Sequence, residues 1–205
     1  MEDVLAVYQR HYEEDEVLIC MDETSKQHIK ETRIPLPTRP GEPERCDYEY
    51  ERNGVSNLFM LFAPLEGWRH VKVTDRHTKV DWAQLIKELV DEHHPKKKII
   101  LVMDNLNTHK LGSLYEAFEP AEARRIADRL EIHYTPKHGS WLDMAEIEIG
   151  VLSRQCLDRR LPDQETLKRE INAWQNTRNQ KAIRVDWRFT AEDARTKLKS
   201  LYPSI

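Results

Sequence analysis

Two aspartates follow directly after uninterrupted runs of apolar residues, Asp22 after residues 17–21 and Asp104 after residues 99–103. Such runs are typical of strands that are buried on both faces. Open α/β sheets place their chemistry at the carboxyl ends of strands, although a single Asp there often only caps the following turn. Two aspartates in the same context therefore predict a pair of carboxylates that act together.

A third acid is expected from a helix predicted at about 142–158, where the candidates are Asp143, Glu146 and Glu148. At about 100° per residue, Glu146 shares a sector of this helix with Asp143 and Gly150, whereas Glu148 lies about 200° away. Glu146 and Glu148 therefore cannot both reach one site. A polar sector beside a glycine suits the wall of an active site, so we select Glu146 and expect Glu148 to make only local ion pairs.

Three converging carboxylates repel one another unless hard cations neutralise them, and ligands that are all oxygen suit Mg²⁺ or Mn²⁺. Asp22, Asp104 and Glu146 are therefore the predicted ligands of a two-metal site. In such sites one cation activates water or a 3′-hydroxyl, and the other stabilises the leaving oxygen of a phosphoryl displacement. The competing interpretation of each acid alone is a cap or a surface ion pair.

The elements that would position these acids follow from hydrophobic pattern and turn residues. Asn53-Gly54 predicts a hairpin turn, and residues 65–67 predict a second turn between two strands. Strands are expected near 17–21, 56–63, 68–74, 98–103 and 132–134. Helices are expected from Thr78 or Asp81 to about 94, at 111–130 with a break at Pro120, at 142–158, at 163–178, and at 191–201 behind a Thr190 cap.

This order predicts an α/β fold with a ribonuclease-H-like mixed sheet, in which a three-strand antiparallel meander is joined by parallel strands and flanked by helices. The length of 205 residues favours a single catalytic domain spanning 1–205. Four prolines predict a surface loop near 31–47, and a C-terminal helical part is expected at about 163–205.

Composition excludes a membrane protein, because no apolar run approaches the roughly 20 residues of a membrane span. The acidic N-terminus lacks the layout of a signal peptide, which predicts a cytoplasmic location. The formal charge is −4, but residues 135–205 carry 13 Lys and Arg against 10 Asp and Glu. The C-terminal third is therefore the side expected to meet a polyanion, although a mixed solvated surface explains the asymmetry equally well.

Three motifs, CMDET at 20–24, MDNLNTHK at 103–110 and YTPKHGSWLDMAEIE at 134–148, resemble those of DDE transposases. The resemblance is to the bacterial insertion-sequence branch of the Tc/mariner superfamily and covers nearly the whole chain. It implies that Asp22, Asp104 and Glu146 form the catalytic triad. It also implies Mg²⁺-dependent cleavage at transposon ends, with Mn²⁺ as a substitute and two ions expected, and joining of the freed 3′ end to target DNA.

The resemblance implies partners as well. The protein would bind transposon-end DNA and target DNA as a homodimer, and it would be associated with the nucleoid when on DNA. Only 16 residues precede Val17, too few for the usual N-terminal helix-turn-helix part, so end recognition is expected from a separate or missing segment. One position departs from the family, because Asp143 stands where Asn is usual. An extra acid there would raise the pKa of Glu146 or offer a cation another ligand.

Other residues have weaker predictions. Asn105 and His109 would orient water, phosphate or the Asp104 carboxylate, although His109 also suits a surface position at a helix start. Lys137 and His138 would contact phosphates, and Trp141 would stack on an unpaired base or anchor the core.

Arg154, with Arg159 and Arg160, would hold backbone phosphates or form a solvated basic face.

Two other functions remain open: a structure-specific nuclease of the ribonuclease H or Holliday-junction type, and an inactive transposase-derived relic that acts as an interaction module. The presence of all three acids argues against the relic.

Overall fold

The computed structural model describes residues 1–33, 38–41, 48–137 and 139–202. Within these residues, one five-stranded sheet has the order β3-β2-β1-β4-β5. Strands β1, β2 and β3 form an antiparallel meander, while β4 runs parallel to β1 and β5 runs parallel to β4. This arrangement confirms the ribonuclease-H-like mixed sheet predicted from the sequence. The strands are β1 (Glu16–Glu31), β2 (Tyr50–Ala63), β3 (Trp68–Thr74), β4 (Lys98–Met103) and β5 (Leu130–Tyr134).

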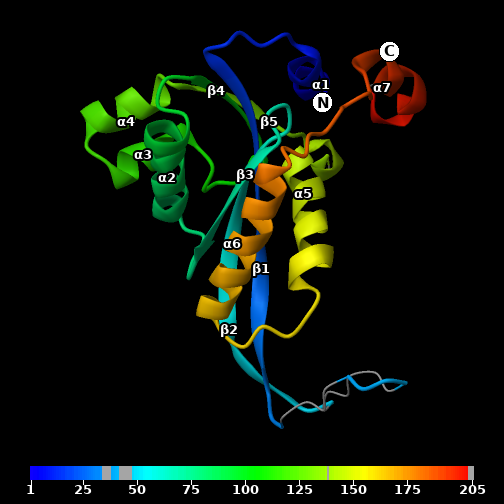
Figure 1. Ribbon diagram of the computed structural model, residues 1–205. Helices are drawn as coiled ribbons and strands as arrows, with labels where there is room; N and C mark the ends of the chain where they lie inside the picture. Colours follow the sequence, from blue (N-terminus) through cyan, green and yellow to red (C-terminus); the bar gives the residue numbers. More distant parts are fainter. Residues whose placement is uncertain (34–37, 42–47, 138, 203–205) are drawn as a thin grey trace.

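Helices cover both faces of the sheet, with α2, α3 and α4 on one side and α5 and α6 on the other (Figure 1). Two α-helices continue into a π-helical turn, α2 into η1 and α5 into η3. The helical segments are α1 (Glu2–Gln9), α2 (Lys79–Glu88), η1 (Leu89–His93), α3 (Leu111–Ala117), α4 (Pro120–Ala127), η2 (Ser140–Leu142), α5 (Met144–Leu152), η3 (Ser153–Leu157), α6 (Gln164–Gln180), α7 (Ala191–Lys197) and η4 (Lys199–Leu201).

The apolar runs of β1 and β4 are buried on both faces because alternate residues point to opposite sides of a strand. Leu18, Cys20 and Val102 pack in one core with residues of α1, α5, α6 and α7. Ile19 and Leu101 pack in the other core with residues of α2, α3 and α4. The continuous hydrophobic runs in the sequence therefore reflect burial between two helical layers.

The expected hairpin turn at Asn53-Gly54 is wrong. Residues 50–63 form one strand, and Gly54 lies inside it with a φ of 94°. The pairing of β1 with β2 shifts register between Gln27 and Ile29, close to this glycine. A positive φ is accessible to Gly, so the Asn-Gly pair accommodates an irregularity within two long strands instead of reversing the chain.

Capping residues were predicted more successfully. Thr78 and Thr190 cap α2 and α7, each in a capping box with an aspartate three residues later. The break at Pro120 between α3 and α4 and the turn between β2 and β3 are also confirmed. Helix α1 was not predicted, and helix α5 begins two residues later than expected because Asp143 caps it.

Much of the predicted proline-rich loop, at 34–37 and 42–47, lies outside the described residues. Within the ranges that the structure describes, no helix combines the length and apolar character of a membrane span.

Candidate active site

The register of β1 against β4 places the two predicted aspartates side by side. Met21 pairs with Met103 in the parallel ladder, and the next residue of each chain segment is Asp22 or Asp104. Neighbouring strands lie about 4.8 Å apart, so the two backbones are adjacent at this level. Asp104 follows the end of β4 as expected, but Asp22 does not end its strand. It lies within β1, at the point where the parallel partner stops and only the antiparallel partner continues.

Helix α5 brings the glutamate to the same face of the sheet. Met144, Ala145 and Leu152 pack in the core that contains Cys20, two residues before Asp22. Glu146 lies in the first turn of α5 and is exposed. Glu146 lies near enough that its charge and that of Asp104 both raise the pKa of Asp22.

Asp22 is difficult to ionise in this setting. Burial, together with the nearby charges of Asp104, Glu146 and Glu23, raises the pKa of Asp22 to about 6. A hydrogen bond from the Glu23 N–H to Asp22 Oδ1, 2.8 Å long, acts in the opposite direction. The net direction indicates a carboxylate that lacks a compensating positive charge.

Asp143 is a fourth acid beneath the same site. Its side chain accepts a 2.8 Å hydrogen bond from the Ala145 N–H, which caps α5. Its other oxygen, Oδ2, is buried and has no hydrogen-bond partner among the described residues. Burial raises the pKa of Asp143 well above its usual range, and the charges of Asp22, Asp104 and Glu146 act in the same direction.

His109 supports Asp104 from the opposite face of the sheet. Its Nδ1 lies 2.6 Å from Asp104 Oδ1, and its Nε2 lies 3.5 Å from Glu23 Oε2. Burial alone would lower the pKa of His109, but the interactions with Asp104 and Glu23 outweigh it and raise the pKa to about 9. The imidazole is fully buried and stacks beside Trp82, so the alternative prediction of a surface histidine is wrong.

Glu23 is a residue that sequence reasoning missed. It follows Asp22 directly, and strand alternation sends it to the other face of β1, toward the α2–α3 layer. The period-2 pattern of β1 was the available signal, but the position of His109 between Glu23 and Asp104 depends on tertiary packing.

Glu148 points away from the acids and into the protein. It is buried between two guanidinium groups, with Oε1 lying 2.8 Å from Arg69 Nε and 2.7 Å from Arg178 Nε. The expectation that Glu148 makes only local ion pairs is therefore wrong. Because Glu148 is committed to this buried cluster, Glu146 is the glutamate of α5 that remains available to the aspartates.

The predicted nucleic-acid contacts divide into two groups around the acids. A cavity of about 640 Å³ is lined in part by Asp104, Asn105, Lys137 and Ser140. Arg154 lines a different cavity, beyond Glu146 along α5. The structure therefore brings Asn105 and Lys137 to Asp104, while Arg154 lies on another side of the acids. His138 lies outside the described residues.

Three predicted contacts have partners within the protein. Trp141 is 39% exposed and contacts Phe189 edge to face with ring centroids 5.6 Å apart, so it is neither fully in the core nor free. Arg159 pairs with Glu170, and Arg160 pairs with Glu31. These two arginines are therefore less available to phosphates than Arg154.

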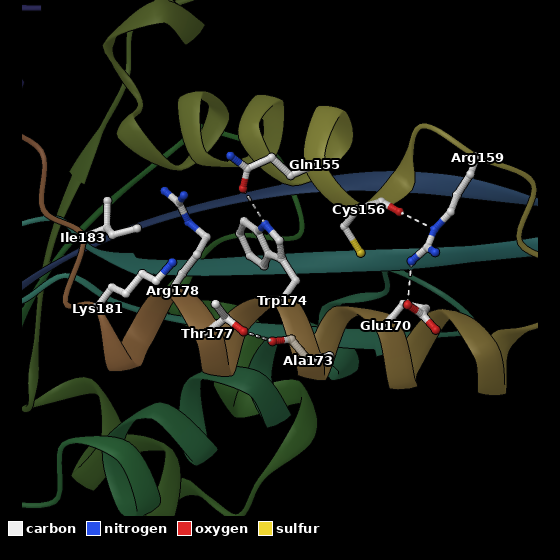
Figure 2. A pocket seen from close by; sticks show the side chains of 10 residues that line it. All are labelled: Gln155, Cys156, Arg159, Glu170, Ala173, Trp174, Thr177, Arg178, Lys181 and Ile183. Atoms are coloured by element: carbon white, nitrogen blue, oxygen red, sulfur yellow. Dashed lines mark hydrogen bonds and ion pairs between the residues drawn. The ribbon is translucent and has the colours of Figure 1, made fainter. Parts of the chain in front are cut away.

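A further cavity of about 480 Å³ lies between the end of the α5–η3 helix and α6. Figure 2 shows Trp174 at its centre, hydrogen-bonded to Gln155, and Arg159 paired with Glu170 at one end. The described residues that line this cavity do not include the predicted carboxylates, so it is separate from the candidate active site.

The acids fit hard cations by their chemistry. Asp22, Asp104 and Glu146 supply only oxygen donors, and Asp143 Oδ2, which has no hydrogen-bond partner among the described residues, is a further oxygen of the same kind. In the described part of the chain, however, no group of three His, Cys, Asp or Glu side chains is already arranged to hold a metal ion. Binding would therefore require these side chains to close around the cation.

Comparisons with known proteins support the fold. The chain is similar in structure to the Mos1 transposase paired-end complex with left transposon end, with a TM-score of 0.60 and 14% identity. It is also similar to the Mos1 mariner paired end complex with Mn, with a TM-score of 0.59 and 14% identity. Both similarities cover 89% of this chain but only 55% of the Mos1 chain, and at this identity they show the fold.

The Mos1 Strand Transfer Complex is similar as well, with a TM-score of 0.56 and 13% identity over 89% of this chain and 58% of that chain. No curated protein sequence matches the chain significantly. The family model for DDE superfamily endonuclease matches residues 17–168, a segment that contains Asp22, Asp104 and Glu146. The chain belongs to the DDE superfamily of endonucleases.

Proposed function

We propose that this chain is the catalytic core of a Tc/mariner-like transposase, of the bacterial insertion-sequence branch, that cleaves DNA at transposon ends and joins the freed 3′ ends to target DNA. The observation that carries the proposal is the β1–β4 register, which places Asp22 beside Asp104 on the face where α5 supplies Glu146. The similar Mos1 structures include paired-end and strand transfer complexes, which supports the same class of reaction.

In this proposal Asp22, Asp104 and Glu146 hold two Mg²⁺ ions, for which Mn²⁺ can substitute. Bound there, the cations would activate the attacking oxygen and stabilise the leaving oxygen of the phosphodiester. His109 has a separate role. By donating to Asp104 Oδ1 it would fix that carboxylate, so that the other oxygen could bind a cation. Asn105 lines the same cavity and would orient the phosphate or water.

The DNA contacts proposed are Lys137 beside Asp104, Arg154 beyond Glu146, and also His138 and Trp141. We further propose that residues 1–205 act as one catalytic domain, that two copies act on DNA as a homodimer in the cytoplasm, and that a helix-turn-helix part outside these residues recognises the ends. The chain spans little more than half of the Mos1 chain, which is compatible with recognition lying elsewhere.

The test is cleavage of supercoiled plasmid in Mg²⁺, in Mn²⁺ and in EDTA. Wild-type protein should nick the plasmid only when a cation is present, and Asp22→Asn and Asp104→Asn should each abolish nicking. Each substitution keeps the side-chain volume and removes a charge, so thermal melting should show an intact fold. Most of the activity surviving in either variant would contradict the assignment.

A joining assay separates a transposase from a structure-specific nuclease on the same fold. A labelled duplex with a free 3′-hydroxyl end is incubated with plasmid and Mn²⁺. A transposase core should attach the label to the plasmid, whereas a nuclease would cut without joining. Wild-type protein that folds but neither nicks nor joins would instead indicate an inactive relic.

A further inference from the structure

A polar groove lies between β1 and η3, the continuation of α5, and we call it the β1–α5 trench. It is a cavity of about 360 Å³. Its lining consists of hydroxyl-bearing, cationic and a few other side chains from the two elements: Thr24, Ser25, Lys26, Ser153, Arg154, Leu157 and Asp158.

The spacing of residues places the trench beyond the acids along the same two elements, although its lining does not include the acids themselves. On β1, Asp22 and Lys26 lie on one face because side chains alternate with a period of two, and each pair of residues advances about 6.7 Å. On α5 and its continuation η3, Glu146 and Arg154 are eight residues apart, or about 12 Å at 1.5 Å per residue. Helix α5 packs against β1, so both walls lead away from the carboxylates in parallel.

Lys26 and Arg154 keep hydrogen-bond donors that are not engaged by described residues of the protein. Lys26 Nζ donates one 2.6 Å hydrogen bond to the Leu157 carbonyl oxygen, which fixes the ammonium at the wall and leaves two of its three donors. Arg154 is exposed and makes no ion pair or hydrogen bond with any residue that the structure describes. Its guanidinium folds back over Gly150, where an added Cβ would lie 3.7 Å from Arg154 Nη1.

This chemistry suits a row of phosphates. Two cations and three hydroxyl groups can donate to phosphate oxygens, and no amide or aromatic side chain in the lining offers a base-reading pattern. One carboxylate, Asp158, stands at the far end and opposes an anion there. The roughly 12 Å from Glu146 to Arg154 corresponds to three or four nucleotides at about 3.4 Å per nucleotide of one strand.

We propose that the β1–α5 trench binds the phosphodiester backbone of the nucleic-acid strand as it leaves the carboxylates, with Lys26 and Arg154 as the phosphate contacts. The inference rests on the proposed function, because it takes Asp22 and Glu146 as the place where the strand is cut. It goes further by giving the strand a path along α5 and by adding Lys26, Thr24 and Ser153 to the binding surface.

The experiment measures binding of the full chain to a fluorescein-labelled oligo(dT) of about 20 nucleotides in EDTA, at several salt concentrations, so that no chemistry intervenes. The slope of log K against log salt is negative, and losing one phosphate contact to single-stranded DNA should reduce its magnitude by about 0.7. Arg154→Ala should show this decrease, and Lys26→Ala combined with Arg154→Ala should show about twice the decrease. Lys181→Ala is the matched control, because Lys181 is an exposed cation in the separate cavity of Figure 2.

An unchanged slope in Arg154→Ala, which loses no internal contact and should fold normally, overturns the proposal. An equal decrease in Lys181→Ala also overturns it, because binding would then follow diffuse charge. Plasmid nicking keeps the two proposals apart. Unchanged slopes with cation-dependent nicking would contradict the trench proposal and support the transposase proposal. The expected slopes without nicking would support phosphate binding in the trench and contradict the transposase proposal.

A second variant tests the path without changing charge. Gly150→Leu places a bulky side chain between Glu146 and Arg154, and it should weaken oligonucleotide binding at constant charge. Gly112→Leu is the control, since a Cβ at Gly112 meets nothing within 4 Å and the residue lies on α3. Equal binding by both glycine variants would contradict the proposed path.

Discussion

At the level of single residues, the candidate site is defined by unbalanced negative charge. Asp22, Asp104, Glu146 and Asp143 act on one another electrostatically, and the nearby positive group is the His109 imidazolium behind Asp104. Proteins do not usually keep buried carboxyl groups without a compensating proton or cation. The arrangement therefore destabilises the folded state, and a bound cation would relieve this destabilisation.

This cost predicts how stability depends on pH without cations. The pKa of Asp22 is raised from an ordinary value of 3.8 to about 6, so the folded state binds more protons than the unfolded state between these pH values. The stabilisation is complete below about pH 4 and is lost as pH rises through about 6, amounting to roughly 3 kcal/mol at most. Asp22→Asn should therefore be more stable than wild type at pH 7 but not at pH 4.

Denaturant titrations of both proteins in EDTA at pH 4 and pH 7 measure this difference. Asp143→Asn should change stability in the same direction, because Asn can still cap α5 through its side-chain oxygen. A stability difference between Asp22→Asn and wild type that does not depend on pH would contradict the raised pKa.

Substitution of His109 should have the opposite effect, a loss of stability. Replacing it with Leu leaves Asp104 and Glu23 without their buried donor and should destabilise the protein by about 3–5 kcal/mol near neutral pH. Since the pKa of His109 is raised to about 9, the stabilisation is present below about 6.5 and is lost as pH rises through about 9. Urea unfolding at pH 6.5 and pH 9.5 should show the difference from wild type shrinking.

His133→Leu provides the control, because His133 also lies between two carboxylates, Asp3 and Glu131, whose side chains are 66% and 29% exposed. That substitution should cost less than about 1 kcal/mol. Similar losses in both histidine variants would show that the burial of His109 between two carboxylates has no special energetic role.

At the level of elements, the orientation of α5 decides which glutamate faces the aspartates. Glu148 fixes one side of the helix to Arg69 of β3 and Arg178 of α6, and this leaves Glu146 on the other side. The side chains of Arg69 and Glu148 are 0% and 3% exposed, so their charges cannot be screened by water.

Glu148→Gln should accordingly destabilise the protein by about 3–5 kcal/mol, because two buried guanidinium groups lose their counter-charge. Glu170→Gln is the matched control, since Glu170 is 27% exposed and pairs with the exposed Arg159. It should cost less than about 1 kcal/mol. Thermal melts of both variants decide the matter, and equal melting temperatures would show that the buried cluster does not hold α5.

The sequence was sufficient where local patterns determine structure. Apolar runs and capping residues located the strands, the Thr78 and Thr190 caps and the break at Pro120, and helical geometry separated Glu146 from Glu148. Prediction from the sequence failed where contacts with distant segments determine the local structure. Asn53-Gly54 has the composition of a turn, but pairing with β1 on a long ladder keeps this segment extended.

Buried charge was equally invisible in the sequence. Neither the position of Glu148 between Arg69 and Arg178 nor that of His109 between Asp104 and Glu23 follows from spacing along the chain. Both depend on which layers of the fold meet. Tertiary packing therefore determined the polar interior, while local pattern determined the elements.

At the level of the whole molecule, seven of the 13 Lys and Arg residues at 135–205 form ion pairs with described residues. Arg159, Arg178 and Arg195 form ion pairs with Glu170, Glu148 and Glu2. The cations that form no ion pair with a described residue include Lys137 beside Asp104, Arg154 in the trench and Lys181 on the far side of α5. Binding to DNA should therefore depend on a few phosphate contacts.

We accordingly expect weak, salt-sensitive DNA binding without preference for a particular sequence, because these cations would contact phosphates and not base edges. Titrations of a candidate end sequence and a scrambled duplex at two salt concentrations test this. Affinities should agree within a few-fold and fall together with salt. A large preference for one duplex would reveal a recognition element within these residues.

The most direct test of the central claim is Mn²⁺ binding to the purified protein at pH 7.5, measured by calorimetric titration. If Asp22, Asp104 and Glu146 close around the same cations, then Asp22→Asn, Asp104→Asn and Glu146→Gln should each weaken Mn²⁺ binding at least roughly tenfold. Glu170→Gln, which removes an acid far from the site, should bind as wild type does. Wild-type affinity in Glu146→Gln, or equal loss in all four variants, would contradict the account.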